Sequence, residues 1–576
     1  MDDSDHLLVA AIDFGTTYSG YAFSTKSDFK KDPLKIHANQ AWNAGGRQLL
    51  SLKTPTVLLL DKNKQFVSFG YEAENKYSDL VMDKEHEEFY YFHRFKMKLH
   101  KNTNLSKTTV IEDITGKSVL AMDVFSLSIQ ALKDHLMELL GKRGTTMTVK
   151  DIRWVLTVPA IWTDAAKQFM RKSAEKAGIP GDNLLIALEP EAASIYCQYL
   201  PTEKLNGAEE GFTMAEVGKK YMIVDLGGGT ADITVHEKQT DGKLKELCKA
   251  TGDACGGTSI DNEFFQLLVK IVGAPLMNSL SKNDPSAYLD LFREFETVKR
   301  TIIPNKTDRM NFTVPFVAFD TLCKKSFGED FPSTVSSCSL SGKISLRGDK
   351  MRADIDVMKA LFLKPMVDII SQISIVIKQC ENVSMLLLVG GFSESEMLQH
   401  AIRKEFPDKR IIVPEDAGLS VLKGAVLFGQ NPDYISSRVL RYTYGYKVKS
   451  EFNHKIHDKA KLVMIDGQEL CGYIFKTVKK INEDTSSGTK VTKPISTTTK
   501  FQRKLQIPVF ASTKEDPMYT DESGCTCIGT VEIEISHPSE EDIYFDVEFN
   551  FGNTEFTVTV TERDTGHSET SKFDFV

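Results

Sequence analysis

The sequence predicts an α/β domain followed by an antiparallel β-domain, and two patterns carry this prediction. From residue 7 to about 430, apolar runs of strand length alternate with helix-like stretches, which is typical of α/β folds. After about residue 435, apolar and polar residues alternate singly, as in strands with one polar face. We therefore expect an α/β domain over 1–435 and a β-domain over 436–576.

Two helices of the α/β domain are expected from their end signals. Thr163 fits an N-cap, apolar residues then recur on one helical face up to Ala177, and Gly178 can end the helix. A second helix is expected to open at Glu189-Pro190, because proline suits the first helical turn.

The strands of the β-domain are expected from alternation. Val531, Ile533 and Ile535 alternate with polar residues, and Phe545–Phe551 continues the pattern up to a turn at Gly552-Asn553. The last five residues, 572–576, also resemble a strand. The domain boundary is expected near Asn431–Arg441.

Composition and charge exclude several classes of protein. The 576 residues carry 71 basic and 79 acidic side chains, so the net charge is −8. Such a charge does not indicate a protein that binds nucleic acid. No continuous segment approaches the roughly 20 apolar residues of a membrane helix, so no membrane span is expected. Nine scattered cysteines, an odd number, are typical of free thiols in a reducing compartment, and we expect a cytoplasmic protein.

Two segments share one pattern, in which a buried strand runs into aspartate, glycine, threonine and a second strand. The first is Asp13-Phe14-Gly15-Thr16-Thr17, and the second runs from Asp225 to Asp232. Glycine lets backbone N–H groups approach an anion, and threonine adds a hydroxyl donor. The aspartates would repel phosphate unless a divalent cation such as Mg²⁺ lay between them. One such motif alone is usually an ordinary tight turn, but two facing hairpins would hold a polyphosphate from both sides.

A third glycine site follows the strand Met385–Val389, which ends in Gly390-Gly391 before a helix expected over about 394–404. Strand, diglycine and helix in succession are typical of nucleotide sites, although diglycine turns are common. Neither a P-loop nor a G-x-G-x-x-G motif after a strand is present, so those nucleotide folds are not supported.

At these three sites the chain resembles the superfamily of actin, hexokinase and the 70-kDa heat-shock ATPases. Ala11–Ser19 is similar to the heat-shock branch in particular, as are Leu156–Ala160, Glu189–Ser194 and Asp225–Asp232, and Glu296–Thr301 is similar to that family's adenosine-contacting helix. The variant residues resemble most the divergent subfamily named heat shock 70 kDa protein 12.

The resemblance implies a fold of two parts. The first is a two-lobed actin-like ATPase domain, a duplicated ribonuclease-H-like fold, with lobe I over about 1–205, lobe II over about 206–410 and a return to lobe I over about 411–430. The second is an all-β sandwich, similar to the family's peptide-binding domain but without its helical lid.

The resemblance also implies a role for each matching residue. Asp13 and Asp225 would hold hydrated Mg²⁺, and Glu189 and Asp232 would orient water and metal near the γ-phosphate of ATP. The phosphates would be cradled by Gly15, Thr16, Thr17, Tyr18, Gly227, Gly228, Gly229 and Thr230. The nucleoside would be held by Gly256, Gly257, Glu296, Lys299, Arg300, Gly390, Gly391 and Asp416.

Some family features are missing. Glu74 falls where the family has a catalytic lysine, which reverses the charge expected beside the γ-phosphate and typically costs about a hundredfold or more in rate. Lys76, Arg94 or Lys96 could substitute in part. The acidic linker, the helical lid and the C-terminal tetrapeptide of the family are absent, which puts substrate trapping and co-chaperone docking in doubt.

Together these observations predict an ATP-binding chaperone-like protein with slow ATPase activity. Mg-ATP or ADP in the cleft would control a β-sandwich that binds unfolded peptide or client protein. One alternative is a nucleotide-dependent interaction or scaffold module with little turnover. A small-molecule kinase of the same superfamily is a minor alternative, because such kinases need no β-rich C-terminal region.

Overall fold

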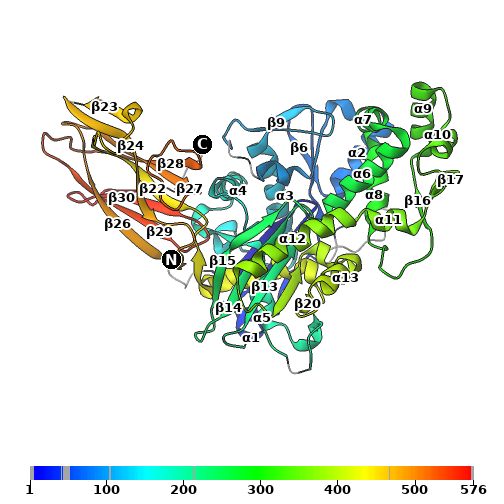
Figure 1. The fold of residues 1–576 in the computed structure, drawn as a ribbon, viewed down its shortest axis with the longest axis horizontal. Coiled ribbons are helices and arrows are strands. Elements are labelled where there is room, and N and C mark those ends of the chain that lie inside the picture. Colours follow the sequence, from blue (N-terminus) through cyan, green and yellow to red (C-terminus); the bar gives the residue numbers. More distant parts are fainter. Residues whose placement is uncertain are drawn as a thin grey trace.

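The computed structural model describes residues 6–39, 42, 52–100, 102, 105–210, 212–214, 216–465 and 467–571. The chain forms a mixed α/β part and a β-rich part (Figure 1). The strand expected at residues 572–576 lies outside the described residues. The division into domains at residue 435 and the duplication of the lobes remain predictions.

The first large sheet carries the first glycine hairpin. Its strand order is β11-β10-β1-β2-β3, with β4 also paired to β2. β1 and β2 are antiparallel, whereas β1, β10 and β11 run parallel. β1 and β10 are buried along their whole lengths, as expected for parallel strands covered on both faces. The bounds are β1 Leu8–Phe14, β2 Tyr18–Thr25, β3 His37–Ala38, β4 Thr54–Pro55, β10 Ile152–Val158 and β11 Leu184–Leu188.

The second large sheet carries the second hairpin, in the order β12-β20-β19-β13-β14-β15-β21-β25. β13 and β14 are antiparallel, and β13, β19 and β20 run parallel. Both sheets therefore place a hairpin tip beside the carboxyl ends of parallel strands, where α/β proteins bind ligands. The bounds are β12 Leu205–Asn206, β13 Lys220–Leu226, β14 Ala231–Lys238, β15 Leu244–Asp253, β19 Met385–Val389, β20 Arg410–Pro414, β21 Ile435–Val439 and β25 Asp484–Ser486.

Two helices pack between the sheets. Residues of α5 (Glu189–Tyr199) and α14 (Ser420–Gln430) share one hydrophobic cluster with both sheets. The two helices cross closely, because a Cβ at Gly424 would overlap the carbonyl of Ala192. Both predicted helices are present: Thr163 caps α4 (Asp164–Lys176) by accepting from the Ala166 N–H, and α5 opens at Glu189 with Pro190 in its first turn.

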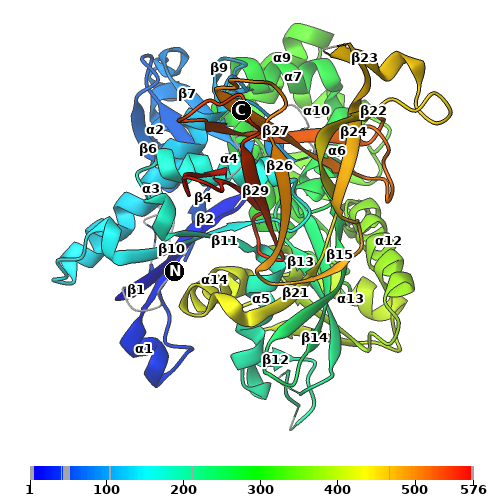
Figure 2. The same ribbon diagram turned by 90° about the vertical axis from the view of Figure 1, so that its left-hand side faces the viewer.

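Of the other helices, Ala121–Lys142 lies beside the first sheet and Leu363–Gln379 beside the second (Figures 1 and 2), whereas Phe316–Phe327 and Phe331–Ser337 lie at the end farthest from the C-terminal sheets (Figure 1). The helix expected over 394–404 is α13, preceded by a 3₁₀ turn at Gly391–Glu394. The bounds are α1 Lys26–Lys31, α2 Tyr71–Met82, α3 Ala121–Lys142, α6 Thr258–Val272, α7 Ala274–Asn283, α8 Pro285–Lys299, α9 Phe316–Phe327, α10 Phe331–Ser337, α11 Ile355–Ala360, α12 Leu363–Gln379 and α13 Glu396–Glu405.

The expectation about membrane helices needs a correction. Within the described residues, the helical segment Ile355–Gln379 is long and apolar enough to span a membrane, with a hydropathy of 1.7, and the bent pair α6–α7 passes the same test only if it counts as one span. Charged side chains such as Lys364 and Asp368 interrupt the apolar run, so the sequence contains no continuous apolar segment of that length here. Ile369, Ile373 and Val376 of this segment lie in a hydrophobic core with the second sheet.

The C-terminal region consists of two antiparallel sheets, β23-β24-β22-β27-β28 and β26-β29-β30-β31. Their facing residues form one hydrophobic cluster, and alternate residues of β29 are buried, as predicted. No α-helix follows Gln430 in the part of the chain that the structure describes. The bounds are β22 Thr443–Glu451, β23 Leu462–Ile465, β24 Gln468–Lys479, β26 Thr489–Ser496, β27 Lys504–Ser512, β28 Cys525–Glu534, β29 Tyr544–Phe551, β30 Thr557–Glu562 and β31 Ser568–Ser571.

Candidate functional site

The tips of the two glycine hairpins lie against each other, although 212 residues separate Asp13 from Asp225 in the sequence. A Cβ added at Gly228 would overlap the Thr17 side chain, and one at Gly229 would overlap Thr16. The close approach of the two tips therefore requires glycine at both positions. This contact brings together the two segments that the sequence predicts to hold phosphate.

Four buried acidic side chains gather beside the tips. Asp13 lies near the end of β1, Asp225 near the end of β13 and Asp232 near the start of β14, and Glu189 begins α5. The exposed fraction is 9% or less for each of the four. Buried carboxylates this close raise one another's pKa unless cations compensate them.

Asp13 is compensated at both carboxylate oxygens. The Thr157 hydroxyl donates to Oδ1 at 2.9 Å, and the Lys53 ammonium donates to Oδ2 at 2.6 Å. Burial alone would raise the pKa of Asp13, but Lys53, with help from Lys96 and Thr157, lowers it below its usual value. Asp13 is therefore ionised at neutral pH.

Glu189 pairs with a second buried lysine. The Lys96 ammonium, only 3% exposed, donates to Glu189 Oε1 at 2.7 Å and lies 5.2 Å from the centre of the Trp162 ring. Burial raises the pKa of Glu189 to about 7, Lys96 opposes this rise, and Asp13 and Asp232 add to it. Glu189 thus exchanges a proton near physiological pH, which suits a general acid or base.

The other two aspartates are less well compensated. Burial raises the pKa of Asp232, and its Oδ2 has no hydrogen-bond partner among the described residues, whereas Oδ1 accepts from the Ile161 N–H at 2.9 Å. Burial, followed by the charges of Glu189, Asp232 and Asp13, raises the pKa of Asp225 well above its usual value. The cluster therefore favours protons or an additional cation.

The beginning of α6 supports the second hairpin tip from behind. The N–H groups of Gly256, Gly257 and Thr258 donate to the carbonyl oxygens of the tip at 3.2, 3.0 and 2.8 Å. A Cβ at Gly256 would overlap the carbonyl of Gly227. The N–H groups of Gly256 and Gly257 thus stabilise the conformation of the tip, and they are already hydrogen-bonded within the protein.

Three of the residues expected at the nucleoside, Glu296, Lys299 and Arg300, lie at the end of α8. Glu296 accepts from Arg300 Nε at 3.0 Å and pairs with Lys299 at 2.5 Å, while the Arg300 side chain stays 57% exposed. Burial and the charge of Glu296 raise the pKa of Tyr18, so its phenol lies near this group. The structure thus joins the first hairpin to α8.

The sequence did not indicate Asp261 on α6. Its buried carboxylate pairs with Lys299 at 2.8 Å and with Arg94 at 2.6 Å. An acidic residue in the first turn of a helix is common, so the sequence signal for Asp261 did not distinguish it from a helix-end charge.

The third glycine site lies in the second sheet, where β19 pairs with β13, beside the second hairpin. Gly390 has a φ of +84°, and a Cβ there would overlap an Asp225 carboxylate oxygen and the Leu226 carbonyl. Gly391 has open space beside it. Asp416 accepts from the Tyr196 hydroxyl at 2.9 Å and pairs with Lys423, so its carboxylate is bound to α5 and α14.

Glu74 pairs with a residue outside the acidic cluster. Its Oε2 lies 3.3 Å from Arg293 Nε, and both side chains are 14% exposed, so the pair bridges α2 and α8. Among the described residues, Lys96 and Lys53 pair with members of the acidic cluster. Lys96 was expected from the sequence as a possible substitute for the family's lysine, whereas Lys53 was not. Lys76 pairs instead with Glu72 on the outer face of α2.

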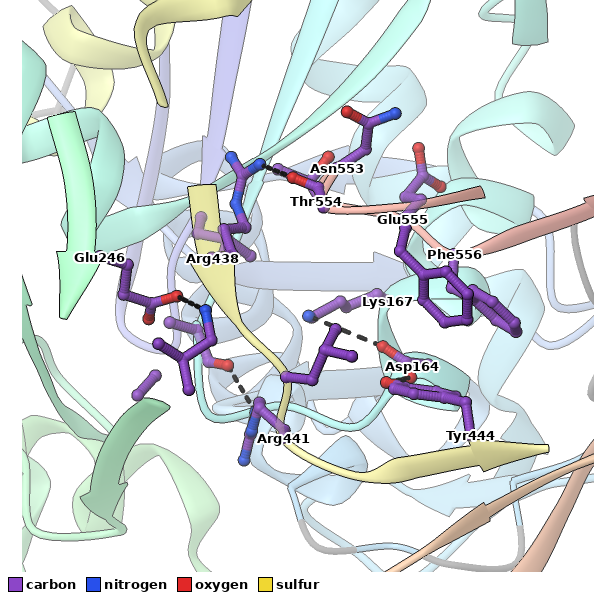
Figure 3. Close-up of a pocket in the computed structure, with 17 residues that line it drawn as sticks. Asp164, Lys167, Glu246, Arg438, Arg441, Tyr444, Asn553, Thr554, Glu555 and Phe556 are labelled. Atoms are coloured by element: carbon purple, nitrogen blue, oxygen red, sulfur yellow. Dashed lines mark hydrogen bonds and ion pairs between the residues drawn. The ribbon is translucent and has the colours of Figure 1, made fainter. Parts of the chain in front are cut away.

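A pocket of about 70 Å³ lies where the C-terminal sheets meet the α/β part (Figure 3). Arg438 Nε and Nη2 each lie 2.7 Å from a carboxylate oxygen of the buried Glu191, and Arg171 pairs with Glu555 in the same two-bond manner. Burial, then the charge of Glu191, raises the pKa of Glu246 in this pocket to about 8.

The loop before α4 joins this junction to the acidic cluster. The Ile161 N–H donates to Asp232, and the carbonyls on either side of it, of Ala160 and Trp162, accept from Arg441 Nη1 at 2.6 and 2.9 Å. Just beyond, Asp164 accepts from the Tyr444 hydroxyl at 2.7 Å. One short loop thus contacts both the predicted phosphate site and the strand that leads into the C-terminal sheets.

The side chains only partly suit Mg²⁺. Carboxylates and hydroxyls are ligands that Mg²⁺ accepts, directly or through water. However, both oxygens of Asp13 accept hydrogen bonds, one of them from an ammonium group. Across the described ranges, no group of three or more His, Cys, Asp or Glu is arranged to hold a metal ion. The arrangement does not fit a metal ion at Asp13 while Lys53 stays there.

Comparisons with known proteins give one consistent result. The family described as Hsp70 protein matches residues 73–430. Heat shock 70 kDa protein 12B of Homo sapiens is 34% identical over 633 residues, covering 99% of this chain and 91% of that protein. Heat shock 70 kDa protein 12A of Homo sapiens is 35% identical over 631 residues, covering 100% and 92%. Chaperone protein DnaK of Mycoplasma mobile is 24% identical over 360 residues, covering 61% and 51%.

Proposed function

Because the chain belongs to the Hsp70 family, we propose that it is an ATP-binding chaperone-like protein in which nucleotide controls the C-terminal sheets. Members of this family generally bind ATP or ADP with Mg²⁺. Nucleotide would lie in the cleft between the two large sheets, and hydrolysis to ADP and phosphate would be slow. The C-terminal sheets would bind an extended segment of an unfolded peptide or client protein.

The observation that carries this proposal is the loop of residues 160–162. It bonds to Asp232 at the predicted phosphate site and to Arg441 at the junction. A ligand that moved Asp232 would change the position of this loop, and the loop would transmit the change to Arg441. Coupling of this kind requires that ATP and ADP favour different positions of the loop.

The proposed roles follow from the contacts. The hairpin tips, Gly15–Tyr18 and Gly227–Thr230, would supply N–H and hydroxyl donors to the phosphates. Glu189 would take a proton from the attacking water, because its pKa lies near neutral pH. The nucleoside would lie among Gly256, Gly257, Glu296, Lys299, Arg300, Gly390 and Gly391, with Asp416 behind it.

A cytoplasmic location is part of the proposal. All nine cysteines are free, and five of them are buried. Free thiols persist in reducing compartments, where disulfides are rare. The account includes no nucleic-acid partner, and it does not specify co-chaperones.

The pH dependence of single-turnover ATP hydrolysis tests the catalytic part of the proposal. The rate is expected to rise with pH through about 7, because only ionised Glu189 can accept a proton. Glu189→Gln should lower the rate by roughly 10²–10⁴-fold without abolishing ATP binding. Glu203→Gln, at an exposed position outside the cleft, is the matched control. A flat pH profile, or full activity of Glu189→Gln, would contradict the assignment.

A second candidate function is a nucleotide-dependent interaction module without useful turnover. The Glu74–Arg293 pair favours it, because the family's lysine position carries a carboxylate that bridges α2 and α8. Tight ATP binding with no measurable hydrolysis at any pH would support this candidate against the first.

A further inference from the structure

The Lys53 ammonium group contacts Asp13, one of the two aspartates that are predicted to hold a metal ion. Its Nζ is 2.6 Å from Asp13 Oδ2 and 2.9 Å from the Gly418 carbonyl oxygen. Lys53 directly precedes β4 of the first sheet, whereas Gly418 follows β20 of the second sheet. The ammonium therefore bridges a segment of the first sheet and a segment that follows the second, and the Lys53 side chain is only 18% exposed.

The same ammonium acts on both predicted metal ligands. Lys53 opposes the rise in the pKa of Asp225 and lowers that of Asp13, so its charge reaches both aspartates. Lys96, the other buried lysine of the cluster, is engaged by Glu189. Of these two lysines, Lys53 is the one hydrogen-bonded to Asp13.

We propose that Lys53 is a built-in cation that takes over, at Asp13, the charge-compensating role of a divalent metal ion. A nucleotide would then bind in this cleft with little dependence on Mg²⁺. The compensating charge is already attached to the chain, so no free ion has to be captured. Mg²⁺ could reach Asp13 directly only by displacing Lys53.

The chemistry of the site supports this role. A phosphate group placed near Asp13 is repelled by its carboxylate unless a positive charge lies between or beside them. An ammonium group is a compact charge with three hydrogen-bond donors, and it binds phosphate oxygens well as a point charge. Removing Lys53 would leave Asp13 with only the Thr157 hydrogen bond and the charge of Lys96, and a free cation could then take the place of the lost ammonium group.

The inference rests on the proposed binding of nucleotide in the cleft, and one experiment separates the two. The affinity of the full chain for ATP is measured by calorimetry, with Mg²⁺ and with a chelator instead, for wild type and Lys53→Met. The affinity of wild type for ATP should change by about threefold or less when the chelator replaces Mg²⁺. In the chelator, Lys53→Met should bind ATP about tenfold or more weakly than wild type, and Mg²⁺ should restore its affinity. Lys53→Arg should behave as wild type.

The controls exclude a folding defect. Lys324→Met removes a lysine that pairs with Asp320 on the exposed face of α9, and it should leave both affinities unchanged. A second measurement titrates Mg²⁺ alone, without nucleotide: Lys53→Met should bind it more tightly than wild type.

Two results would overturn the inference. If wild type and Lys53→Met lose affinity equally on chelation, Lys53 does not replace the metal, although the proposed function stands. If neither protein binds ATP with or without Mg²⁺, the proposed function fails and this inference fails with it.

Discussion

At the scale of single residues, the candidate site is a balance of charge. Four buried carboxylates face two buried or partly buried lysines, Lys53 and Lys96. Burial raises the pKa values of Glu189 and Asp225, and the neighbouring acids add to the rise because two lysines do not compensate four acids. Such perturbed groups concentrate at functional sites, where their proton or cation affinity is used.

Changing Lys96 should move the proton affinity of Glu189. The charge of Lys96 opposes the rise in the pKa of Glu189, so Lys96→Met should raise that pKa above about 7. The midpoint of the pH profile for ATP hydrolysis is expected to shift upward, and the rate at pH 7 to fall. Lys98→Met, at an exposed position on the same 3₁₀ turn, serves as the control. An unchanged midpoint in Lys96→Met would count against this account of the Glu189 pKa.

The sequence predicted part of this charge balance. Asp13, Asp225 and Asp232 stand in motifs with glycine and threonine, so their place beside the hairpin tips could be expected from the sequence. Lys53 stands in no motif, and only the tertiary fold brings it to Asp13. The contact between Glu74 and Arg293 likewise joins residues that are distant in sequence, so the sequence could not indicate which group Glu74 would face.

At the scale of elements, the close contact between the two hairpin tips is the main feature of the candidate site. The tips follow from sequence, because a buried strand, a glycine turn and a second strand are local patterns. The contact between the two tips does not follow from the sequence, because it depends on how the two sheets pack around α5 and α14. The backbone bonds from the start of α6 then fix the second tip.

A single methyl group at the tip should separate the two hairpins. Gly228→Ala places a Cβ against Thr17, so the tips must move apart and the phosphate donors lose their alignment. ATP affinity is expected to fall about tenfold or more, or about 1.4 kcal/mol. Gly141→Ala, in open space on α3, should leave affinity unchanged. Equal affinities for the two variants, measured by calorimetry, would show that the tips do not hold phosphate.

At the scale of the whole molecule, α5 connects the two functional regions. Glu189 in its first turn faces the acidic cluster, and Glu191 in the same turn holds Arg438 at the junction. Removing one partner of a buried ion pair typically costs about 3–5 kcal/mol of folding stability, so the Glu191–Arg438 pair should hold α5 firmly to the junction. The alternation of apolar residues predicted the C-terminal sheets, but not the ion pairs that attach them.

Hydrogen exchange of the full chain with ATP and with ADP tests the central claim most directly. The account predicts that the two nucleotides give different exchange rates in β22–β28 and that both protect the hairpin tips. Arg441→Ala should retain protection of the tips but lose the difference in the C-terminal sheets, because the link to residues 160–162 is cut. Identical exchange in β22–β28 with ATP and ADP in the wild-type chain would contradict the control of these sheets by nucleotide.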